Sequence, residues 1–345
     1  MAERVLTERE LNRALLARQL LLERAKLPIP RALERVGGIQ AQYAPSSYVG
    51  LWSRLAGLER GDLTRALERR TVVQGTLMRV TIHLVSARDY PLMTAAVKEA
   101  RRASWLKARR NVDPSMVEAA AERVRSLLAD GPRPRGELVR ELGVDSQVWN
   151  GVGMYVDLLR IPPSGTWEQR RADLYALAEH WIEHKPAAPE AGAEHLLKRY
   201  LGAFGPASLK DAANWAGLHP SALAPVAERL RLRRFRDERG AELLDLPGAP
   251  LPDPDTPAPV RFLPWWDATT LVHVRRTQIL PERHRPLVFN TTTPHSTATF
   301  LVDGRVAGKW EEEGGRVRVE AFERLPSAAR RELDDESERL AAFLA

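Results

Sequence analysis

Two stretches of the sequence share a plan that restricts what the chain can fold into. The stretch "GPRPRGELVRELG" begins at Gly131, and "GPASLKDAANWAGL" begins at Gly205. Both open with Gly-Pro and run into a short amphipathic helix, and each is followed by a strand-like, arginine-bearing segment ("TWEQRRADLYAL" and "RLRRFRDERGAELLDL"). Further helices are expected before and after these stretches, at 114–129, 146–160, 193–202 and 220–230. This diverged repeat predicts a series of small, similar units.

The N-terminal part contains the same elements in the same order. Leucines recur at helical spacing over residues 7–24, and Thr7 and Glu10 have the spacing of a capping box. A second helix is expected at 28–36, where a Gly-Gly pair ends it. After those glycines the periodicity changes, so we expect the chain to leave the helical state there.

The stretch "IQAQY" then alternates apolar and polar residues. As an extended strand it would bury Ile39, Ala41 and Tyr43 and would turn Gln40 and Gln42 together to the other face. On a helix the two amides would diverge by about 200°. Taken alone, the triplet is more typical of a polar strand edge than of a catalytic pair.

Residues 46–55 and 61–70 are expected to form two further helices, and Tyr48 and Trp52 on the first of them are expected in the core. The segment "QGTLMRVTIHLVSARDYP" predicts a half-buried strand. Its polar face would carry Arg79, Thr81 and His83. A helix, a short strand, two helices and a terminal strand pair are the order of a winged-helix domain.

We therefore expect a mainly α protein with some β structure, in which three tandem winged-helix (helix-turn-helix) domains precede a small β-rich domain in a C-shaped arrangement. The expected boundaries are 1–112, 113–188 and 189–247 for the three winged helices, 248–259 for a proline-rich linker, and 260–345 for the last domain with its terminal helix. In that domain strands are expected in "ATTLVHV" (268–274), "PLVFN" (286–290), "ATFLVDGRVAGKW" (298–310) and "GRVRVEAF" (315–322).

Composition excludes several classes of chemistry. The chain has no cysteine, which removes disulfides, thiol catalysis and cysteine-ligated zinc. His180 and His184 lie four residues apart, but no third ligand follows at a recognisable spacing, so we expect neither a metal nor a cofactor. An uninterrupted apolar run long enough for a membrane span or a signal peptide is absent from the sequence, and we expect a cytoplasmic protein.

Positive charge is concentrated near the N-terminus. Residues 1–130 hold 23 lysines and arginines against 14 acidic residues, whereas the remainder holds 29 against 31. Such an excess favours binding to a polyanion, although an arginine-rich solvated surface explains it equally well. The residues expected to contact such a polyanion are Arg79, Thr81, His83, Arg101, Arg102, Lys107, Arg109 and Arg110.

Several segments together resemble the AlkZ/YcaQ-like family of winged-helix DNA glycosylases, which unhook interstrand crosslinks. They are "LNRALLARQLLLERAKLPIPRALERVGGIQAQYAPSSYVGLWSRL", "TLMRVTIHLVSARDY", "RFLPWWDATTLVHVRR" and "ATFLVDGRVAGKW". The most diagnostic element of the family is a Gln-apolar-Gln or Gln-apolar-Asp triplet, and "QAQ" resembles the AlkZ-type version. The resemblance implies that Gln40 and Gln42 are catalytic in a monofunctional glycosylase for double-stranded DNA, and that the residues expected to contact a polyanion contact DNA or the lesion. Such a protein would associate with the nucleoid when bound to DNA. We expect a monomer, because a C-shaped arrangement of tandem domains would clasp DNA without a second copy.

Two amides suit the chemistry that the resemblance implies. Alkylation at guanine N7 places a positive charge on the base and weakens the N-glycosidic bond, so the base leaves without a protonating acid. The amides then need only position water and stabilise an oxocarbenium-like sugar. Expected substrates are cationic alkylated purines and crosslinks, for repair or for self-resistance to a genotoxic natural product. The alternatives are a winged-helix DNA-binding regulator without catalysis and a protein-interaction scaffold.

Overall fold

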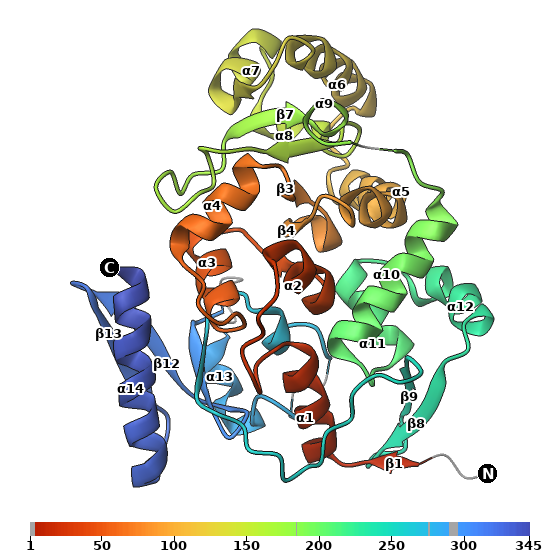
Figure 1. Ribbon diagram of the computed structural model, residues 1–345. Helices are drawn as coiled ribbons and strands as arrows, with labels where there is room; N and C mark the ends of the chain where they lie inside the picture. The colour runs from red at the N-terminus through yellow and green to blue at the C-terminus, as the bar shows by residue number, and fades with distance from the viewer. Residues whose placement is uncertain (1–3, 184, 275–276, 290–295) are drawn as a thin grey trace.

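The computed structural model describes residues 4–183, 185–274, 277–289 and 296–345, and it shows a mixed helical and β-sheet protein (Figure 1). The first helix, α1 (Glu8–Arg18), has the predicted capping box between Thr7 and Glu10. It ends earlier than residue 24 because Leu20 adopts a left-handed backbone conformation, with φ of 57°. A short strand, β1 (Val5–Leu6), precedes it.

The order helix, short strand, helix, helix, β-hairpin occurs three times, and we call these segments the first, second and third repeat units. The first consists of α2 (Ile29–Val36), β2 (Ile39–Gln40), α3 (Ala44–Trp52), α4 (Arg60–Glu68), β3 (Val72–Thr76) and β4 (Ile82–Ser86). The second consists of α6 (Pro114–Leu128), β5 (Arg133–Pro134), α7 (Arg135–Leu142), α8 (Ser146–Val152), β6 (Leu158–Arg160) and β7 (Leu174–Leu177).

The third repeat unit has a single β-bridge between Ala207 and Leu244 in place of the short strand. Its other elements are α10 (Pro189–Phe204), α11 (Leu209–Ala216), α12 (Pro220–Arg229), β8 (Arg233–Asp237) and β9 (Glu242–Asp245). The long helix α5 (Tyr90–Ala108) connects the first unit to the second, and the short helix α9 (Ala178–Trp181) follows β7. The repeated order predicted from the two Gly-Pro stretches is therefore present in the structure.

The first two units share one six-stranded sheet, in the order β2-β4-β3-β6-β7-β5. Its two halves join where β3 pairs antiparallel with β6, through Gln74 opposite Arg160 and Gly75 opposite Leu159. The hairpin of the third unit instead forms a separate sheet with β1. Helix α10 of the third unit packs against α5, so all three units meet around these two helices (Figure 1).

The strand predicted across residues 74–91 is wrong in its middle part, where the chain turns. The segment is a hairpin whose turn includes Met78–Val80, and both Arg79 (φ 52°) and Val80 (φ 60°) have left-handed backbones. The apolar–polar alternation of the sequence does not mark this turn, because tertiary contacts hold the turn in place. Gly217 makes this possible, since a Cβ there would lie 3.0 Å from the Arg79 backbone nitrogen.

The C-terminal part contains a four-stranded sheet in the order β10-β11-β12-β13 and a long terminal helix. The bounds are β10 (Arg261–Leu263), β11 (Thr299–Val302), β12 (Arg305–Glu313), β13 (Arg316–Ala321) and α14 (Ser327–Leu344), with short helical turns η2 (Ala268–Thr270), η3 (Glu282–His284) and α13 (Arg285–Val288). The strands expected in the last two predicted segments, around 298–310 and 315–322, are confirmed.

The other two strands expected in this part are wrong. Residues 268–274 contain η2 instead, because the Asp267 side chain accepts a hydrogen bond from the Thr269 backbone and caps a helical turn. Residues 286–289 include most of α13, and Asn290 lies outside the described residues. In both cases β-branched residues suggested strands, and a capping side chain or a proline in the first turn determined the local structure instead.

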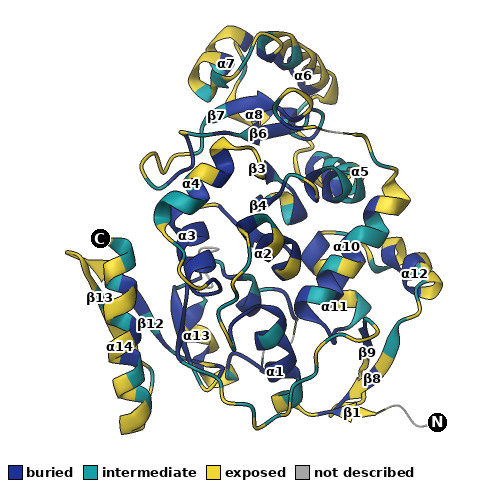
Figure 2. Ribbon diagram, viewed as in Figure 1, coloured by how far each residue is buried: buried dark blue, intermediate teal, exposed yellow. Residues whose placement is uncertain are grey.

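The interior of the first unit is apolar, and Figure 2 shows the buried stretches of α2 and α3 in dark blue. Tyr48 (0% exposed) and Trp52 (8% exposed) lie in this core, as expected. Across the described residues, no helix combines the length and the apolar character needed to cross a membrane.

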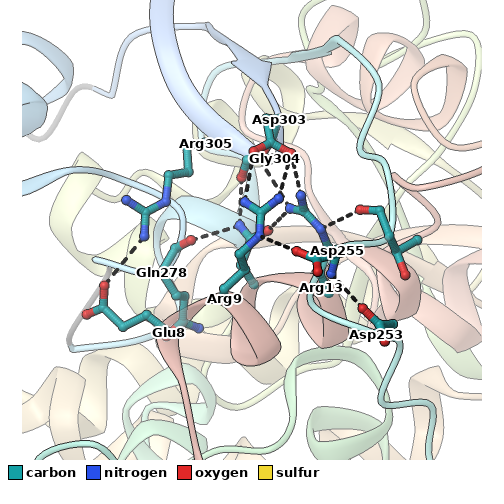
Figure 3. A network of polar contacts seen from close by, with 11 residues as sticks. Glu8, Arg9, Arg13, Asp253, Asp255, Gln278, Asp303, Gly304 and Arg305 are labelled. Atoms are coloured by element: carbon teal, nitrogen blue, oxygen red, sulfur yellow. Dashed lines mark hydrogen bonds and ion pairs between the residues drawn. The ribbon is translucent and has the colours of Figure 1, made fainter.

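Helix α1 is the junction between distant parts of the chain. Arg13 has no solvent exposure, and its guanidinium donates to the Thr256 carbonyl (2.7 Å) and to both the carbonyl and the carboxylate of Asp303 (Figure 3). Asn12 donates to the carbonyls of Gln278 (2.8 Å) and Gly304 (2.7 Å). Gly304 cannot be replaced without a shift, because a Cβ there would lie 2.5 to 2.8 Å from three side-chain atoms of α1.

One turn further along, Arg18 and Asp245 form a fully buried, bidentate ion pair, with N–O distances of 2.7 and 3.0 Å. Arg18 also donates to the carbonyls of Leu201 (2.8 Å) and Pro250 (3.0 Å). This single side chain therefore connects α1 to the third repeat unit and to the segment that follows it.

The Arg18→Met substitution should lower the free energy of unfolding by about 3–5 kcal/mol, because it leaves the Asp245 carboxylate buried without its partner. Adding Asp245→Asn to that variant should recover much of the loss, since the amide carries no charge. Arg9→Met should cost about 1 kcal/mol or less, because the side chain of Arg9 is 43% exposed. Chemical denaturation measures all three, and equal losses for the single and the double variant would contradict the argument.

Candidate active site

The two glutamine side chains meet, as predicted, but the strand expected over residues 39–43 ends at Gln40 and Tyr43 is half-buried rather than buried. Gln40 is the last residue of β2 and is buried, whereas Gln42 follows at a bend in the chain and is exposed. The Gln40 Nε2 group donates a hydrogen bond to Gln42 Oε1. The pair is therefore one unit, in which a buried amide holds an exposed amide in place.

Arg79 fixes the orientation of this pair. Its guanidinium is mostly buried and donates to Gln40 Oε1 (3.2 Å) through one nitrogen and to the Trp215 carbonyl (2.6 Å) through another. A guanidinium has donors only, so the Gln40 oxygen must face Arg79 and the Gln40 NH2 group must face Gln42. The Trp215 carbonyl belongs to the last turn of α11, where helix carbonyls lack intrahelical partners and carry partial negative charge.

His83 lies beside the pair in a neutral form. It is directly opposite Gln40 in the β2–β4 ladder and is 3% exposed. Burial, reinforced by the nearby charge of Arg79, lowers the pKa of His83 to about 3. Its Nδ1 lies 3.0 Å from the Thr81 carbonyl, and because a carbonyl can only accept, Nδ1 carries the proton and Nε2 presents a lone pair.

The other residues expected to bind DNA or a lesion are distributed unevenly. Thr81 is half-buried, and its hydroxyl donates to the Met78 carbonyl (2.9 Å) within the turn. Arg102 is half-buried and lies over the Tyr155 ring, 5.1 Å from its centroid. Exposed side chains that remain free to reach DNA lie at the end of α5 and just after it: Lys107, Arg109 and Arg110.

Arg79 and Arg101 do not lie on the solvated surface where a phosphate contact was expected. Arg101 is 5% exposed, and it donates to the Thr76 carbonyl and to the Gly153 carbonyl (3.1 Å). The helical pattern of "RRASWLKARR" did not show this, because Arg101 faces the second repeat unit rather than water. Its guanidinium connects the first two units.

Sequence reasoning missed the aromatic residues next to the glutamines. Tyr43 stacks on Trp265, with ring centroids 5.1 Å apart, and the Tyr43 hydroxyl accepts a hydrogen bond from Arg170 (3.0 Å). These residues and Trp167 line a cavity of about 520 Å³. Trp266 has a φ of 59°, a strained conformation that accompanies the exposure of Trp265. The two adjacent tryptophans of "PWWD" were the only sequence signal for this cavity.

The histidine pair considered for metal binding falls partly outside the structure. His180 is exposed on α9, and His184 lies outside the described residues. In the parts of the chain that the structure describes, no three His, Cys or acidic residues are grouped closely enough to hold a metal ion.

This arrangement offers neutral hydrogen-bonding groups rather than a strong acid or base. Gln42 presents an amide that both donates and accepts, and the neutral imidazole of His83 lies opposite Gln40. Such groups can position a water molecule and can interact with a developing positive charge through their oxygen dipoles. A reaction that needs little acid assistance would suit this chemistry.

Known proteins similar to this chain share one description. A family model described as "DNA glycosylase AlkZ-like" matches residues 33–343. The "Interstrand DNA cross-link repair glycosylase" of Streptomyces sahachiroi is 25% identical over 350 residues, which cover 90% of each chain. The solved structure of the Streptomyces sahachiroi DNA glycosylase AlkZ superposes with a TM-score of 0.83 at 21% identity, covering 99% of this chain and 97% of that one. The matched region includes both glutamines, Arg79 and His83.

The lowered pKa of His83 predicts a pH dependence of stability. Between pH 3 and its ordinary value near 6.5, His83 is neutral in the folded protein and protonated in the unfolded chain. The free energy of unfolding of wild type should therefore fall by up to about 1.4 kcal/mol per pH unit because of this group as the pH drops below 6.5. Above that pH, His83 should have no effect on it. His83→Gln should remove that part of the slope, and the exposed control His180→Gln should not. Denaturation at pH 5 to 7.5 measures it, and identical slopes for wild type and His83→Gln would refute the assignment.

Proposed function

The chain belongs to the AlkZ-like DNA glycosylase family, whose members are hydrolases of N-glycosyl bonds, and from this premise we propose that it excises cationic alkylated purines from double-stranded DNA. The proposed substrates are N7-alkylguanine adducts and interstrand crosslinks formed through such bases. The observation that carries the proposal is the Gln40–Gln42 pair, in which an anchored buried amide holds an exposed one.

The proposed reaction matches the neutral site. A base that already carries a positive charge leaves as a neutral molecule, so the enzyme need not protonate it. The sugar then becomes oxocarbenium-like and needs an oriented water and an oxygen dipole directed at its positive charge. We assign the water-positioning role to Gln42 and the orienting role to Gln40, whose own oxygen is occupied by Arg79. Undamaged bases leave as anions and would not react.

A buried arginine beside a cationic transition state needs electrostatic compensation. The Trp215 carbonyl at the C-terminus of α11 and the Gln40 oxygen both face the Arg79 guanidinium. These two acceptors partly offset the charge of Arg79. Arg79 therefore acts as a positioning residue in this proposal, and the earlier expectation that it contacts phosphate is replaced.

The three repeat units correspond to the three winged-helix domains that we propose, with the segment at 248–259 as linker and residues 260–345 as the C-terminal domain. Each unit has the order of helices and a terminal hairpin that defines this fold. With these domains in a C-shaped arrangement, a monomer would enclose duplex DNA. Lys107, Arg109 and Arg110, which are exposed, would contribute to phosphate contacts, with Arg102 nearby.

A non-catalytic winged-helix regulator is the alternative, and membership of a glycosylase family disfavours it. Within the proposed activity, a general repair enzyme and a self-resistance enzyme for one genotoxic natural product would use the same glutamines. A panel of N7-alkylguanine adducts of increasing size separates them, because a dedicated enzyme would excise one bulky adduct far faster than N7-methylguanine.

Replacing either glutamine by alanine should slow single-turnover excision of an N7-alkylguanine adduct by about 10²-fold or more, the loss seen for single preorganised groups in other enzymes. Gln42→Asp should retain substantial activity, because a carboxylate keeps an acceptor oxygen and adds charge, as in the other branch of the family. DNA affinity, measured in parallel, should change little. Excision at the wild-type rate by both alanine variants would rule out the catalytic assignment.

Arg79→Met should slow excision by about 10- to 10²-fold, because Gln40 would lose the contact that sets its amide orientation. Combining it with Gln40→Ala should give little further loss, since both changes remove the same orientation. Arg79→Lys should recover part of the rate. If the two single effects multiply in the double variant, Arg79 does not act through Gln40.

A further inference from the structure

A second cavity, of about 360 Å³, lies where the β3–β4 turn of the first repeat unit faces the second unit. Val80 lies at its edge and is 38% exposed, an unusual exposure for a valine in a strained turn. Arg101 lines it from α5 and Arg160 from β6, and Arg109 and Arg135 line it from the end of α5 and the start of α7. Three elements, the connecting helix α5 and the second unit's β6 and α7, thus direct arginines at one space.

The charges of this cavity are unbalanced. Asp157 is the acidic residue in its lining, and it pairs with Lys98 at 3.0 Å. The four arginines therefore have no equal number of carboxylates among the lining residues. Arg101 is 5% exposed, and its Nε has no hydrogen-bond partner among the described residues. Positive charges in a partly buried cavity are costly without a counter-charge, and an anion in the cavity would compensate the charges of these arginines.

The arginines are held in place rather than dispersed in solvent. Arg160 donates to the Thr76 hydroxyl (3.1 Å) and lies over the Tyr175 ring, 5.3 Å from its centroid. Arg135 lies over the Trp149 ring at 5.9 Å. Aromatic rings therefore orient two of the planar guanidinium groups before any ligand arrives, which lowers the entropy lost on binding.

We propose that this cavity binds a phosphodiester group of the DNA strand. The inference rests on the proposed function only in taking DNA as the ligand. Guanidinium groups match phosphate in a forked, two-bond geometry, and several of them around one cavity are typical of phosphate recognition. The volume lies at the small end of the range for ligand sites, enough for a phosphate with part of its sugar. Sequence reasoning placed Arg101 and Arg109 on one basic surface facing DNA, whereas in the structure both line this cavity and Arg101 is buried.

The site is next to the catalytic pair along the chain. Val80 contacts the cavity, and its neighbour Arg79 donates to Gln40. A phosphate held here would therefore place the DNA strand against the turn that orients the glutamines. This makes the cavity a positioning site for the strand, separate from the groups that meet the lesion.

The test uses the full chain and undamaged duplex DNA, so that binding is measured without excision. The variants are Arg135→Gln, Arg160→Gln and the double variant, and the control is Arg331→Gln, an equal loss of charge at an exposed position on α14. Each phosphate contact contributes about 0.9 to the slope of log affinity against log salt. The double variant should lower that slope by about 1, whereas Arg331→Gln should leave it unchanged. Unfolding midpoints establish that each variant is folded.

Arg160→Lys keeps the charge without the fork and should give an intermediate affinity at wild-type slope. A wild-type slope and affinity in the folded double variant would overturn the proposal. Inorganic phosphate supplies the second arm: stabilisation of wild type by phosphate that is absent in the double variant, with an unchanged DNA slope, would assign the cavity to free phosphate and overturn the DNA assignment. Excision by wild type is assayed separately, so a failure of the glycosylase proposal would leave this result interpretable.

Discussion

The buried guanidinium groups of α1 are the constraint on which the arrangement of the units depends. A fully buried arginine is tolerated only when acceptors surround it, so Arg13 and Arg18 must draw acceptors from distant segments. Arg18 takes them from the third repeat unit, and Arg13 takes them from the C-terminal part. The next residue, Gln19, donates to the carbonyls of Val36 (3.1 Å) and Ala203 (3.0 Å). The end of α2, directly before β2, is thereby fixed against the third unit.

The glycine pair after α2 is explained by the same junction. Gly37 has a φ of 78°, and a Cβ there would lie 3.2 Å from the Phe204 ring. Gly38 has a φ of 82°, and its Cβ would lie 2.8 Å from Val85. Both positions combine a left-handed backbone with close packing, which only glycine accepts without strain. The break in the helix is therefore the means by which Gln40 enters the sheet beside β4.

The sequence predicted the element order and the common face of the glutamines because both depend on local periodicity and capping. It did not predict the partner of Arg79, since the Trp215 carbonyl lies 136 residues away and no side-chain pattern marks a backbone acceptor. The sequence also did not predict the burial of Arg101, for a related reason. A basic helix face is usually solvated, and only the packing of α5 on the second unit brings it to the interior. The strands expected at 268–274 and 286–290 are wrong because a capping side chain or a proline outweighed the β propensity of these residues.

The strained turn between β3 and β4 links the two sites. Left-handed backbones at consecutive non-glycine residues cost about 1–3 kcal/mol each and persist only when other contacts impose them. Here the Leu77 backbone donates to the Thr81 carbonyl (3.0 Å), and the Thr81 hydroxyl donates to the Met78 carbonyl. Arg79 is anchored on α11 while Val80 is left exposed at the cavity between the first two units. A relaxed turn would place neither residue in this way. The strain is therefore the structural cost of directing one side chain to the glutamine pair and its neighbour to the arginine-lined cavity.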